Sequence, residues 1–181
     1  MANSRNTALL VVDMLNPYEH DDADQLTQSV ETIVTPLREL IARAGGEDTE
    51  LIYVNDNYGD WKVTRDDIAD QALNGARPDL VEPLLPPDGA DFVMKARHTI
   101  FYMTPLEYLL QQREIGHLVL AGQVTEQCIL YSALDAYVRH FEVSVPRDGV
   151  AHIHEDLAEA ALGMMERNMG AEITSCAEVR L

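Results

Sequence analysis

Cysteine and long apolar runs are scarce in this sequence of 181 residues. Two cysteines, Cys128 and Cys176, are too few for a disulfide framework, and Cys176 has no partner motif, so we expect it to be structural. A reducing cytoplasm is therefore the expected location. No apolar stretch approaches the roughly 18 residues that a membrane-spanning helix needs, which argues against a helical membrane protein.

Positive charge is also scarce. Thirteen Lys and Arg residues stand against 31 Asp and Glu residues, which gives a formal net charge of −18 at pH 7. Such a field repels phosphate backbones and anionic lipid surfaces, so nucleic-acid and membrane partners are disfavoured. Only two of the cations are lysines, Lys62 and Lys95, and a lysine inside a motif is therefore informative.

What the sequence does contain is typical of a globular α/β protein. Apolar residues make up 46% and charged residues 24%, so neither a disordered tail nor a fibrous repeat fits, and the length predicts a single domain over residues 1–181. Nearly continuous apolar runs alternate with helical patterns, which predicts six parallel strands with helices on both faces, in a doubly wound sheet. The runs are 8–12, 50–54, 90–94, 117–121, 141–145 and 171–174.

Four helical patterns and one long connection separate these runs. Apolar residues recur at helical spacing within 26–41, and Pro36 should kink that helix. The letters TPLE at 104–107 predict a capping box at the start of another helix, and 125–139 and 157–165 predict two more. The connection 55–89 is unusually long, so we expect it to hold a small helix and to cover part of the molecule.

The ends of the predicted strands gather polar side chains. Asp13 follows the first strand, Asp56 the second and Lys95 the third, and Cys128 lies shortly after the fourth. Because ligands of open parallel sheets bind at the carboxyl ends of the strands, these side chains should share one edge. An acid, a lysine and a cysteine together suggest covalent catalysis.

In that chemistry Cys128 is the nucleophile and Asp13 the acid–base group. Cys128 would lie in the first turn of a helix, where free N–H groups and Lys95 favour a thiolate. Asp13 would accept the thiol proton and later give it to a leaving amine, while N–H groups of the turn GQVTEQC bind an oxyanion. The alternative is a small buried cysteine on a core helix, an Asp13 that caps a turn and a Lys95 that pairs with an acid.

Three segments in this order and spacing resemble a known family. ALLVVDMLNPY around Asp13, DFVMKARHTIFYMTPLEYLL around Lys95 and LVLAGQVTEQCILYSALDAY around Cys128 are similar to motifs of the isochorismatase-like cysteine hydrolases. That family includes nicotinamidases and N-carbamoyl amide hydrolases, and the resemblance runs from about Thr7 to Ala171. Three linked motifs are far more specific than one.

The resemblance implies both a fold and a site. It implies a strand order of 3-2-1-4-5-6, a catalytic triad of Asp13, Lys95 and Cys128, and a non-proline cis bond between Gln123 and Val124. The backbone N–H groups of Val124 and Cys128 would form the oxyanion hole. The expected activity is hydrolysis of a small amide, carbamoyl or related C–N bond in a small-molecule substrate, and relatives suggest a homo-oligomer, either a dimer or a tetramer.

The chain departs from some branches of that family. Nicotinamidases place an Asp and two His residues after the second strand for a metal, whereas this chain has VNDNYGDW there, so we expect no zinc and no other cofactor. Cys128 favours an acyl-enzyme over the cysteine-free hydrolysis of a vinyl ether, in which Asp13 would act as an acid. A non-catalytic binding or assembly protein on the same scaffold is the alternative from another class. His152 and His154 are more typical of a solvated loop than of metal ligands.

Several aromatic and basic residues are candidates for substrate contact. Tyr18, Trp61 and Phe101 lie near the three motifs, where they could bind substrate, although each is as typical of ordinary core packing. Arg97 and His98 could meet an anionic substrate, and a solvent-facing loop role is the simpler interpretation of both.

Overall fold

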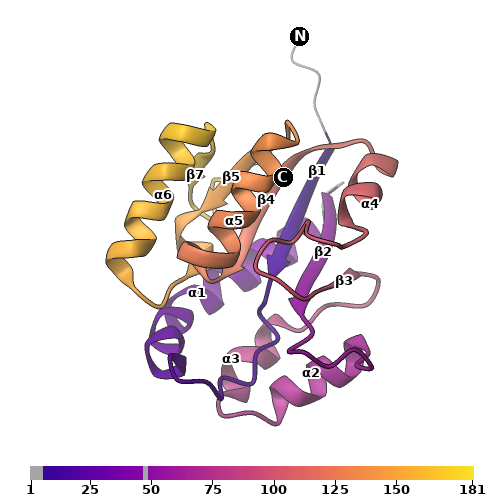
Figure 1. Cartoon of the computed structure of the whole chain (residues 1–181), viewed down its shortest axis with the longest axis vertical. Helices are drawn as coiled ribbons and strands as arrows, with labels where there is room; N and C mark the ends of the chain where they lie inside the picture. Colours follow the sequence, from indigo (N-terminus) through magenta and orange to yellow (C-terminus); the bar gives the residue numbers. More distant parts are fainter. Residues whose placement is uncertain (1–5, 47–48) are drawn as a thin grey trace.

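The computed structural model describes residues 6–46 and 49–181, which form seven parallel strands in one sheet. Six of the strands follow the order β3-β2-β1-β4-β5-β7 (Figure 1), and the seventh, β6, pairs with the end of β4. The strands are β1 (Asn6–Val12), β2 (Thr49–Asp56), β3 (Asp91–Lys95), β4 (Ile115–Gln123), β5 (Glu142–Pro146), β6 (Val150–Ala151) and β7 (Glu172–Thr174).

The predicted fold class and strand order are confirmed, but the predicted number of six strands is one too few. The additional strand, β6, has only two residues, Val150 and Ala151, which pair with Gly122 and Gln123. A strand of two residues leaves no apolar run in the sequence that could predict it. β4 is longer than the predicted 117–121: it runs from Ile115 to Gln123, and both of these end residues are buried.

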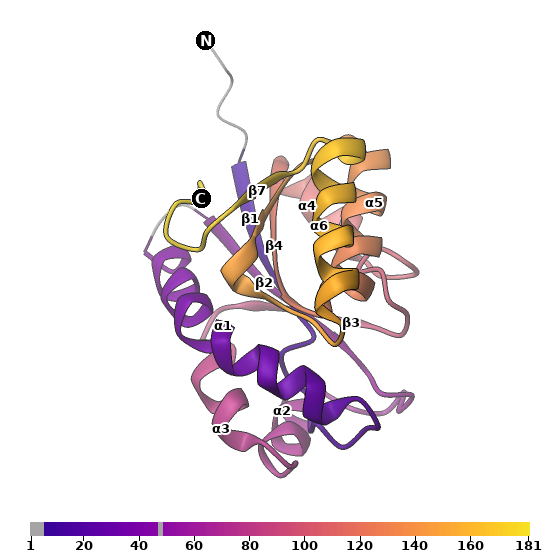
Figure 2. The ribbon, with the colours of Figure 1, turned by 90° about the vertical axis from the view of Figure 1, so that its left-hand side faces the viewer.

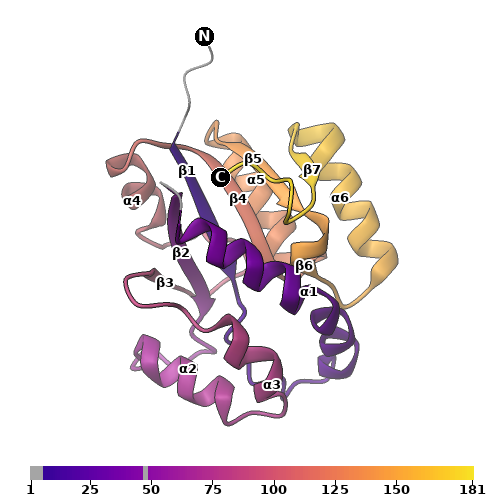
Figure 3. The same ribbon diagram turned by 180° about the vertical axis from the view of Figure 1, so that it is seen from behind.

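Helices cover both faces of the sheet. Figure 2 shows the sheet with α1 on one side and α4, α5 and α6 on the other, and Figure 3 shows α1 crossing the back. None of the helices in the described part of the chain is long and apolar enough to cross a membrane. The helices are α1 (Ala23–Ala44), α2 (Arg65–Leu73), α3 (Pro78–Val81), α4 (Leu106–Gln112), α5 (Leu130–Val138) and α6 (Glu155–Met169).

The two faces explain why the central strands are apolar at nearly every position. In β1, Ala8 and Leu10 face a core cluster that includes residues of α4, α5 and α6, whereas Leu9 and Val11 face a second cluster that includes residues of α1, α2 and α3. A strand that is buried on both faces does not alternate between apolar and polar residues. The continuous apolar runs in the sequence therefore follow from packing on both faces of the sheet.

All four predicted helices are present, and the last two described below begin differently from the prediction. α1 continues through Pro36 as one helix. α4 begins at Leu106 without a capping box: the Thr104 hydroxyl accepts a hydrogen bond of 3.4 Å from the N–H of Leu106 and donates one of 2.6 Å to the carbonyl of Ile100. The helix predicted over 125–139 begins with a single π-helical turn, Thr125–Ile129, before α5.

The long connection between β2 and β3 folds as expected into short helices that cover the carboxyl end of the sheet. α2, α3 and a 3₁₀ turn at Glu82–Leu84 occupy it, and Figure 1 shows α2 and α3 beyond the ends of β1 and β2. Gly75 fixes the connection against the loop after β1. A Cβ atom there would lie only 2.3 Å from the carbonyl oxygen of Pro17, so no side chain fits.

Candidate active site

Asp13 is the first residue after β1, at the centre of the sheet's carboxyl edge. Its φ of 56° lies in the left-handed region, which non-glycine residues seldom adopt and which is found more often at functional sites. One carboxylate oxygen, Oδ1, accepts a hydrogen bond of 2.8 Å from the backbone N–H of Asp56. The other, Oδ2, lies 2.8 Å from Nζ of Lys95. The backbone and the side chain of Asp13 are thus both held in place.

Lys95 ends β3 and reaches across β2 to the same point. Its side chain is 1% exposed, and Nζ lies 3.6 Å from a carboxylate oxygen of Asp56 and 3.6 Å from Sγ of Cys128. Burial lowers the pKa of Lys95, but the charges of Asp13, Cys128 and Asp56 outweigh it and raise that pKa above its ordinary value. The ammonium group therefore stays charged at neutral pH.

The Asp13 carboxyl has its pKa shifted toward the protonated form. Burial raises the pKa of Asp13, whereas Lys95, hydrogen bonding to Cys128 and the N–H of Asp56 only partly offset that rise. A carboxyl group whose pKa lies above its usual range can hold a proton in one step of a reaction and release it in another. Asp13 therefore has the properties of an acid–base group.

Cys128 lies in the π-helical turn that follows β4 and is 7% exposed. Burial and the charge of Asp13 raise the pKa of its thiol to about 12, although Lys95 and the backbone of Val124 oppose the shift. Burial therefore favours the protonated thiol at rest and opposes the thiolate that the helix turn and Lys95 favour. A base must remove this proton as the sulfur attacks.

The segment before Cys128 passes close to Asp13. The peptide bond between Gln123 and Val124 is cis, and the Gln123 side chain donates a hydrogen bond of 2.6 Å to the Asp13 carbonyl. Gly122 has φ of 113°, and a Cβ atom there would lie 2.2 Å from the carbonyl oxygen of Val12, so only glycine fits. The close approach of these two strands places the turn that carries Cys128 beside Asp13.

Two residues at the end of β2 and just after it, Asn55 and Tyr58, line another side of the site, and the sequence had given neither a role. Asn55 exchanges hydrogen bonds with the backbone of Leu15, at 3.0 and 3.1 Å. The Tyr58 hydroxyl donates to the carbonyl of Leu15 at 2.7 Å, and burial and the charge of Asp13 raise the pKa of Tyr58 well above its usual value. These two side chains hold the loop after β1 at the edge of the site.

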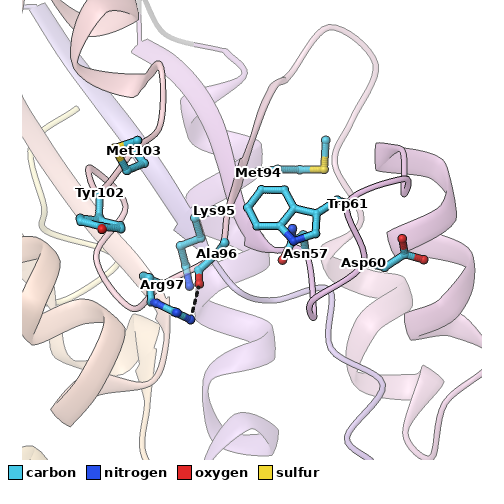
Figure 4. Close-up of a pocket in the computed structure, with 9 residues that line it drawn as sticks. All are labelled: Asn57, Asp60, Trp61, Met94, Lys95, Ala96, Arg97, Tyr102 and Met103. Atoms are coloured by element: carbon cyan, nitrogen blue, oxygen red, sulfur yellow. Dashed lines mark hydrogen bonds between the residues drawn. The ribbon is translucent and has the colours of Figure 1, made fainter.

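Two pockets flank Lys95. One, with a volume of about 360 Å³, is lined by Asp13, Tyr58, Val124 and Cys128. The other, of about 380 Å³, is mostly apolar and is shown in Figure 4. In this view Trp61 and Met94 lie on one side, Tyr102 and Met103 lie on the other, and Arg97 is between them with a hydrogen bond to the carbonyl of Ala96.

The three aromatic candidates occupy different environments. Trp61 is 81% exposed and lines the apolar pocket. Tyr18 is buried, and its hydroxyl donates to the Gln123 side chain at 3.4 Å, so it contacts the segment that leads to Cys128. Phe101 lies in the core, stacked on Phe141 under the guanidinium of Arg139, so this placement does not support contact with substrate.

The two paired histidines are anchored through their backbone. The backbone N–H of His154 donates to the Glu126 carboxylate at 2.8 Å, and that of His152 donates to the Ser29 hydroxyl at 3.0 Å. Within residues 6–46 and 49–181, no group of three or more His, Cys, Asp or Glu side chains is placed to hold a metal ion. His98 is the histidine whose ring lies near the sulfur, at 3.7 Å.

Known proteins are similar to this chain over most of its length. A family model described as an isochorismatase domain matches residues 7–178. The uncharacterized isochorismatase family protein YaaI of Bacillus subtilis (strain 168) is 34% identical over 93% of this chain and 93% of its own length. Maleamate amidohydrolase of Pseudomonas putida is 28% identical over 94% of this chain and 84% of its own. The crystal structure of the nicotinamidase SaPncA from Staphylococcus aureus, 25% identical, superposes with a TM-score of 0.71 over 94% of this chain and 98% of that one.

Proposed function

The chain belongs to the isochorismatase family, and we propose that it hydrolyses a small amide, carbamoyl or related C–N bond through a covalent acyl-enzyme on Cys128. The observation that carries the proposal is that one lysine contacts both other residues: Lys95 Nζ lies 2.8 Å from Oδ2 of Asp13 and 3.6 Å from Sγ of Cys128. A nucleophile, a fixed positive charge and an acid–base group within contact of each other are the parts that acyl transfer requires.

In the first half of the proposed reaction, Sγ of Cys128 attacks the carbonyl carbon of the substrate. The thiol proton passes to a base, for which Asp13 is the family's residue, and the carbonyl oxygen becomes an oxyanion. The backbone N–H groups of Val124 and Cys128 stabilise this charge, because the first turn of a helix leaves such groups without intrahelical partners. When the C–N bond breaks, the nitrogen takes a proton and leaves as ammonia or an amine.

In the second half, water hydrolyses the thioester. Asp13 takes a proton from the water molecule, the resulting hydroxide attacks the acyl carbon, and the sulfur leaves and is protonated again. Lys95 remains charged throughout, where it stabilises the negative charge that moves between Asp13 and the sulfur. The products are a carboxylic or carbamic acid and an amine, and the site returns to its starting state.

The pocket dimensions favour a small substrate. The pocket at Cys128 has about 360 Å³, and the apolar pocket across Lys95 could receive the remainder of a substrate. Trp61 is the aromatic candidate best placed for substrate contact, and Tyr18 acts through Gln123. The expected dimer or tetramer stays a prediction; α5 presents the apolar side chains that such an assembly could cover, namely Tyr131, Leu134, Tyr137 and Val138.

A screen of primary amides and N-carbamoyl compounds with ammonia detection tests the proposal. The relatives named above act on maleamate and nicotinamide, so both compounds belong in the screen. Once a substrate is found, Cys128→Ala should abolish turnover, and its thermal midpoint should stay near that of the wild type. Cys176→Ala is the matched control and should keep its turnover. Unchanged turnover in Cys128→Ala would overturn the mechanism.

One observation favours a second candidate function. Because burial raises the pKa of Asp13, this residue could act as a carboxylic acid on a vinyl ether, with no bond to the sulfur. In that case Cys128→Ala would keep its turnover of the ether, whereas Asp13→Asn would lose it. The two single variants therefore separate the two candidate reactions.

A further inference from the structure

Glu126 lies two residues before Cys128, in the same π-helical turn, and it is buried although it carries a carboxylate. Only 9% of the residue is exposed. Its Oε1 atom accepts two backbone hydrogen bonds, one of 3.0 Å from the N–H of Ile153 and one of 2.8 Å from the N–H of His154. The turn that carries Cys128 is therefore tied to the segment between β6 and α6.

This contact supplies a cap that α6 lacks in its own sequence. In a capping box, a Glu or Gln side chain at the third helical position accepts a hydrogen bond from the N–H of the N-cap residue. The N-cap of α6 is His154, whose side chain makes no capping hydrogen bond, and the third helical position holds the apolar Leu157. Glu126 provides the carboxylate from another part of the chain, and the helix dipole favours a negative charge there.

Two further hydrogen bonds hold the segment between β6 and α6. The Thr125 hydroxyl, also in the turn, donates a hydrogen bond of 2.8 Å to the carbonyl of Ala151. On the other side, the N–H of His152 donates to the Ser29 hydroxyl of α1 at 3.0 Å. The backbone at Ile153 is thus fixed both to the turn and to α1.

The side chain of Ile153 forms part of the wall of the pocket at Cys128. It is one of three aliphatic residues that line this pocket, together with Leu26 and Val124, and it packs against the core cluster that contains both of them. Leu26 and Val124 are buried, whereas Ile153 is only partly buried. Ile153 therefore presents an apolar surface beside the nucleophile, which limits a bound group by its shape.

We propose that Ile153 determines the size of the acyl group that Cys128 can carry, and that Glu126 is the positioning residue that holds Ile153 in place. This inference rests on the proposed function and names its substrate class: compounds with a small acyl part, such as a carbamoyl or short aliphatic group, in preference to an aromatic one. Glu126 does not line the pocket, so it acts through Ile153. Asp13 keeps its role as the acid–base group.

Methanethiosulfonates measure this size limit without any substrate, because each reagent leaves its own group on the sulfur. The thiolate of Cys128 attacks the sulfenyl sulfur, an S–S bond forms and methanesulfinate leaves. The rates of the benzyl and the methyl reagent at pH 7.5, followed by intact mass in a Cys176→Ala parent protein, give a benzyl/methyl ratio. This ratio should be about tenfold or more lower in the parent than for the unhindered thiol glutathione.

Two pairs of variants test the two residues. Ile153→Ala should raise the ratio about tenfold, because it removes part of the wall. Ile173→Ala, the same substitution at a partly buried residue of β7 outside the pocket, is its matched control and should leave the ratio unchanged. Glu126→Ala should raise the ratio about fivefold, since the wall is then free to move. Asp67→Ala is the control, because that carboxylate accepts from the N-cap N–H of α2 in the same way and caps a different helix.

The conservative variant and a double variant separate positioning from a general loss of structure. Glu126→Gln keeps an oxygen acceptor at the same reach, so its ratio should stay within about twofold of the parent. In Glu126→Ala/Ile153→Ala the loss of Glu126 should change the ratio by less than about twofold, because the side chain that it positions is already absent. A general loosening of the turn would speed both reagents alike and would not change the ratio.

Three results would overturn the inference. A parent ratio equal to that of glutathione, or an unchanged ratio in folded Ile153→Ala, would show that Ile153 sets no size limit. Effects that multiply in the double variant would show that Glu126 does not act through Ile153. If Glu126→Ala does not fold, Glu126→Asp replaces it in the same comparison, because its shorter side chain cannot reach both N–H groups. None of these results depends on the proposed function, since loss of turnover in Cys128→Ala would leave the hydrolase mechanism standing.

Discussion

Two networks of buried polar side chains lie at opposite ends of the same sheet, and one is charged while the other is neutral. At the carboxyl end, Lys95 forms an ion pair with Asp13 at 2.8 Å. Near the amino end, His117 of β4 forms hydrogen bonds with the hydroxyls of Thr7, at 3.1 Å, and Ser144, at 2.8 Å. Burying charge costs more than burying a satisfied hydrogen bond, so the comparison indicates that the carboxyl end is built for chemistry and the amino end for stability.

The electrostatics of the two networks differ in the same sense. Burial and the charge of Arg180 lower the pKa of His117, although Glu142 and Glu172 oppose the shift, so its ring is neutral at pH 7. Ser144 links the ring to the Glu172 carboxylate, to which it donates at 2.9 Å. At the other end the pKa of Lys95 is raised, and its charge is kept. Variants at each end test whether this division holds.

The largest expected effect is that of Lys95→Met. This change leaves Asp13 buried without its partner, and the loss of one member of a buried ion pair costs about 3–5 kcal/mol in the free energy of unfolding. Turnover should also be abolished. Lys62→Met is the matched control at an exposed position, and its effect should stay within about 0.5 kcal/mol. Urea denaturation measures both variants, and a Lys95→Met protein as stable as the wild type would contradict the view that the buried Asp13 carboxyl depends on Lys95.

A smaller effect is expected from His117→Leu at the amino end. The substitution leaves the buried Thr7 hydroxyl without its partner, which should cost about 1–3 kcal/mol of unfolding free energy. Turnover and the alkylation rate of Cys128 should remain those of the wild type, because the network does not contact the site. A large loss of turnover in a folded His117→Leu protein would contradict this division, since it would show that the two ends of the sheet are energetically coupled.

The smallest effect concerns pH. Because the pKa of His117 is lowered in the folded protein, the unfolded chain binds the additional proton when pH falls through its ordinary value near 6.5, and the folded state loses stability there. His117→Leu lacks this term, so its deficit relative to the wild type should be smaller at pH 5 than at pH 7.5. Urea denaturation at both values measures the difference, and a deficit that does not change with pH would show that His117 does not titrate as a buried neutral ring.

Much of the fold could be predicted because burial on both faces leaves a plain pattern in the sequence. The apolar runs around Leu9 and Leu120 exist because neighbouring residues pack into different cores, and that pattern locates the main strands. β6 could not be found, since a pairing of two residues depends on the path of the neighbouring chain. The predicted capping box was also wrong, because the turn before α4 leads the Thr104 hydroxyl to accept from the N–H of Leu106 and to donate to the Ile100 carbonyl.

The catalytic candidates could be placed at one edge of the sheet from the sequence, but their protonation states and neighbours could not. Strand ends locate Asp13 and Lys95, whereas the raised pKa of Cys128 follows from burial that only the folded structure has. The contact of His98 with the sulfur depends on a π-helical turn and on side chains of α5 that anchor its loop. Residue type alone also does not predict that Trp61 is exposed to solvent while Phe101 is buried in the core.

The most direct test of the covalent mechanism is the intact mass of the wild-type protein quenched with acid during turnover of a substrate found in the screen. The account predicts a transient increase equal to the mass of the acyl group, located by peptide mapping on Cys128 and absent from Cys128→Ala. Steady turnover by the wild type with no adduct at any time, together with undiminished turnover by Cys128→Ala, would contradict it.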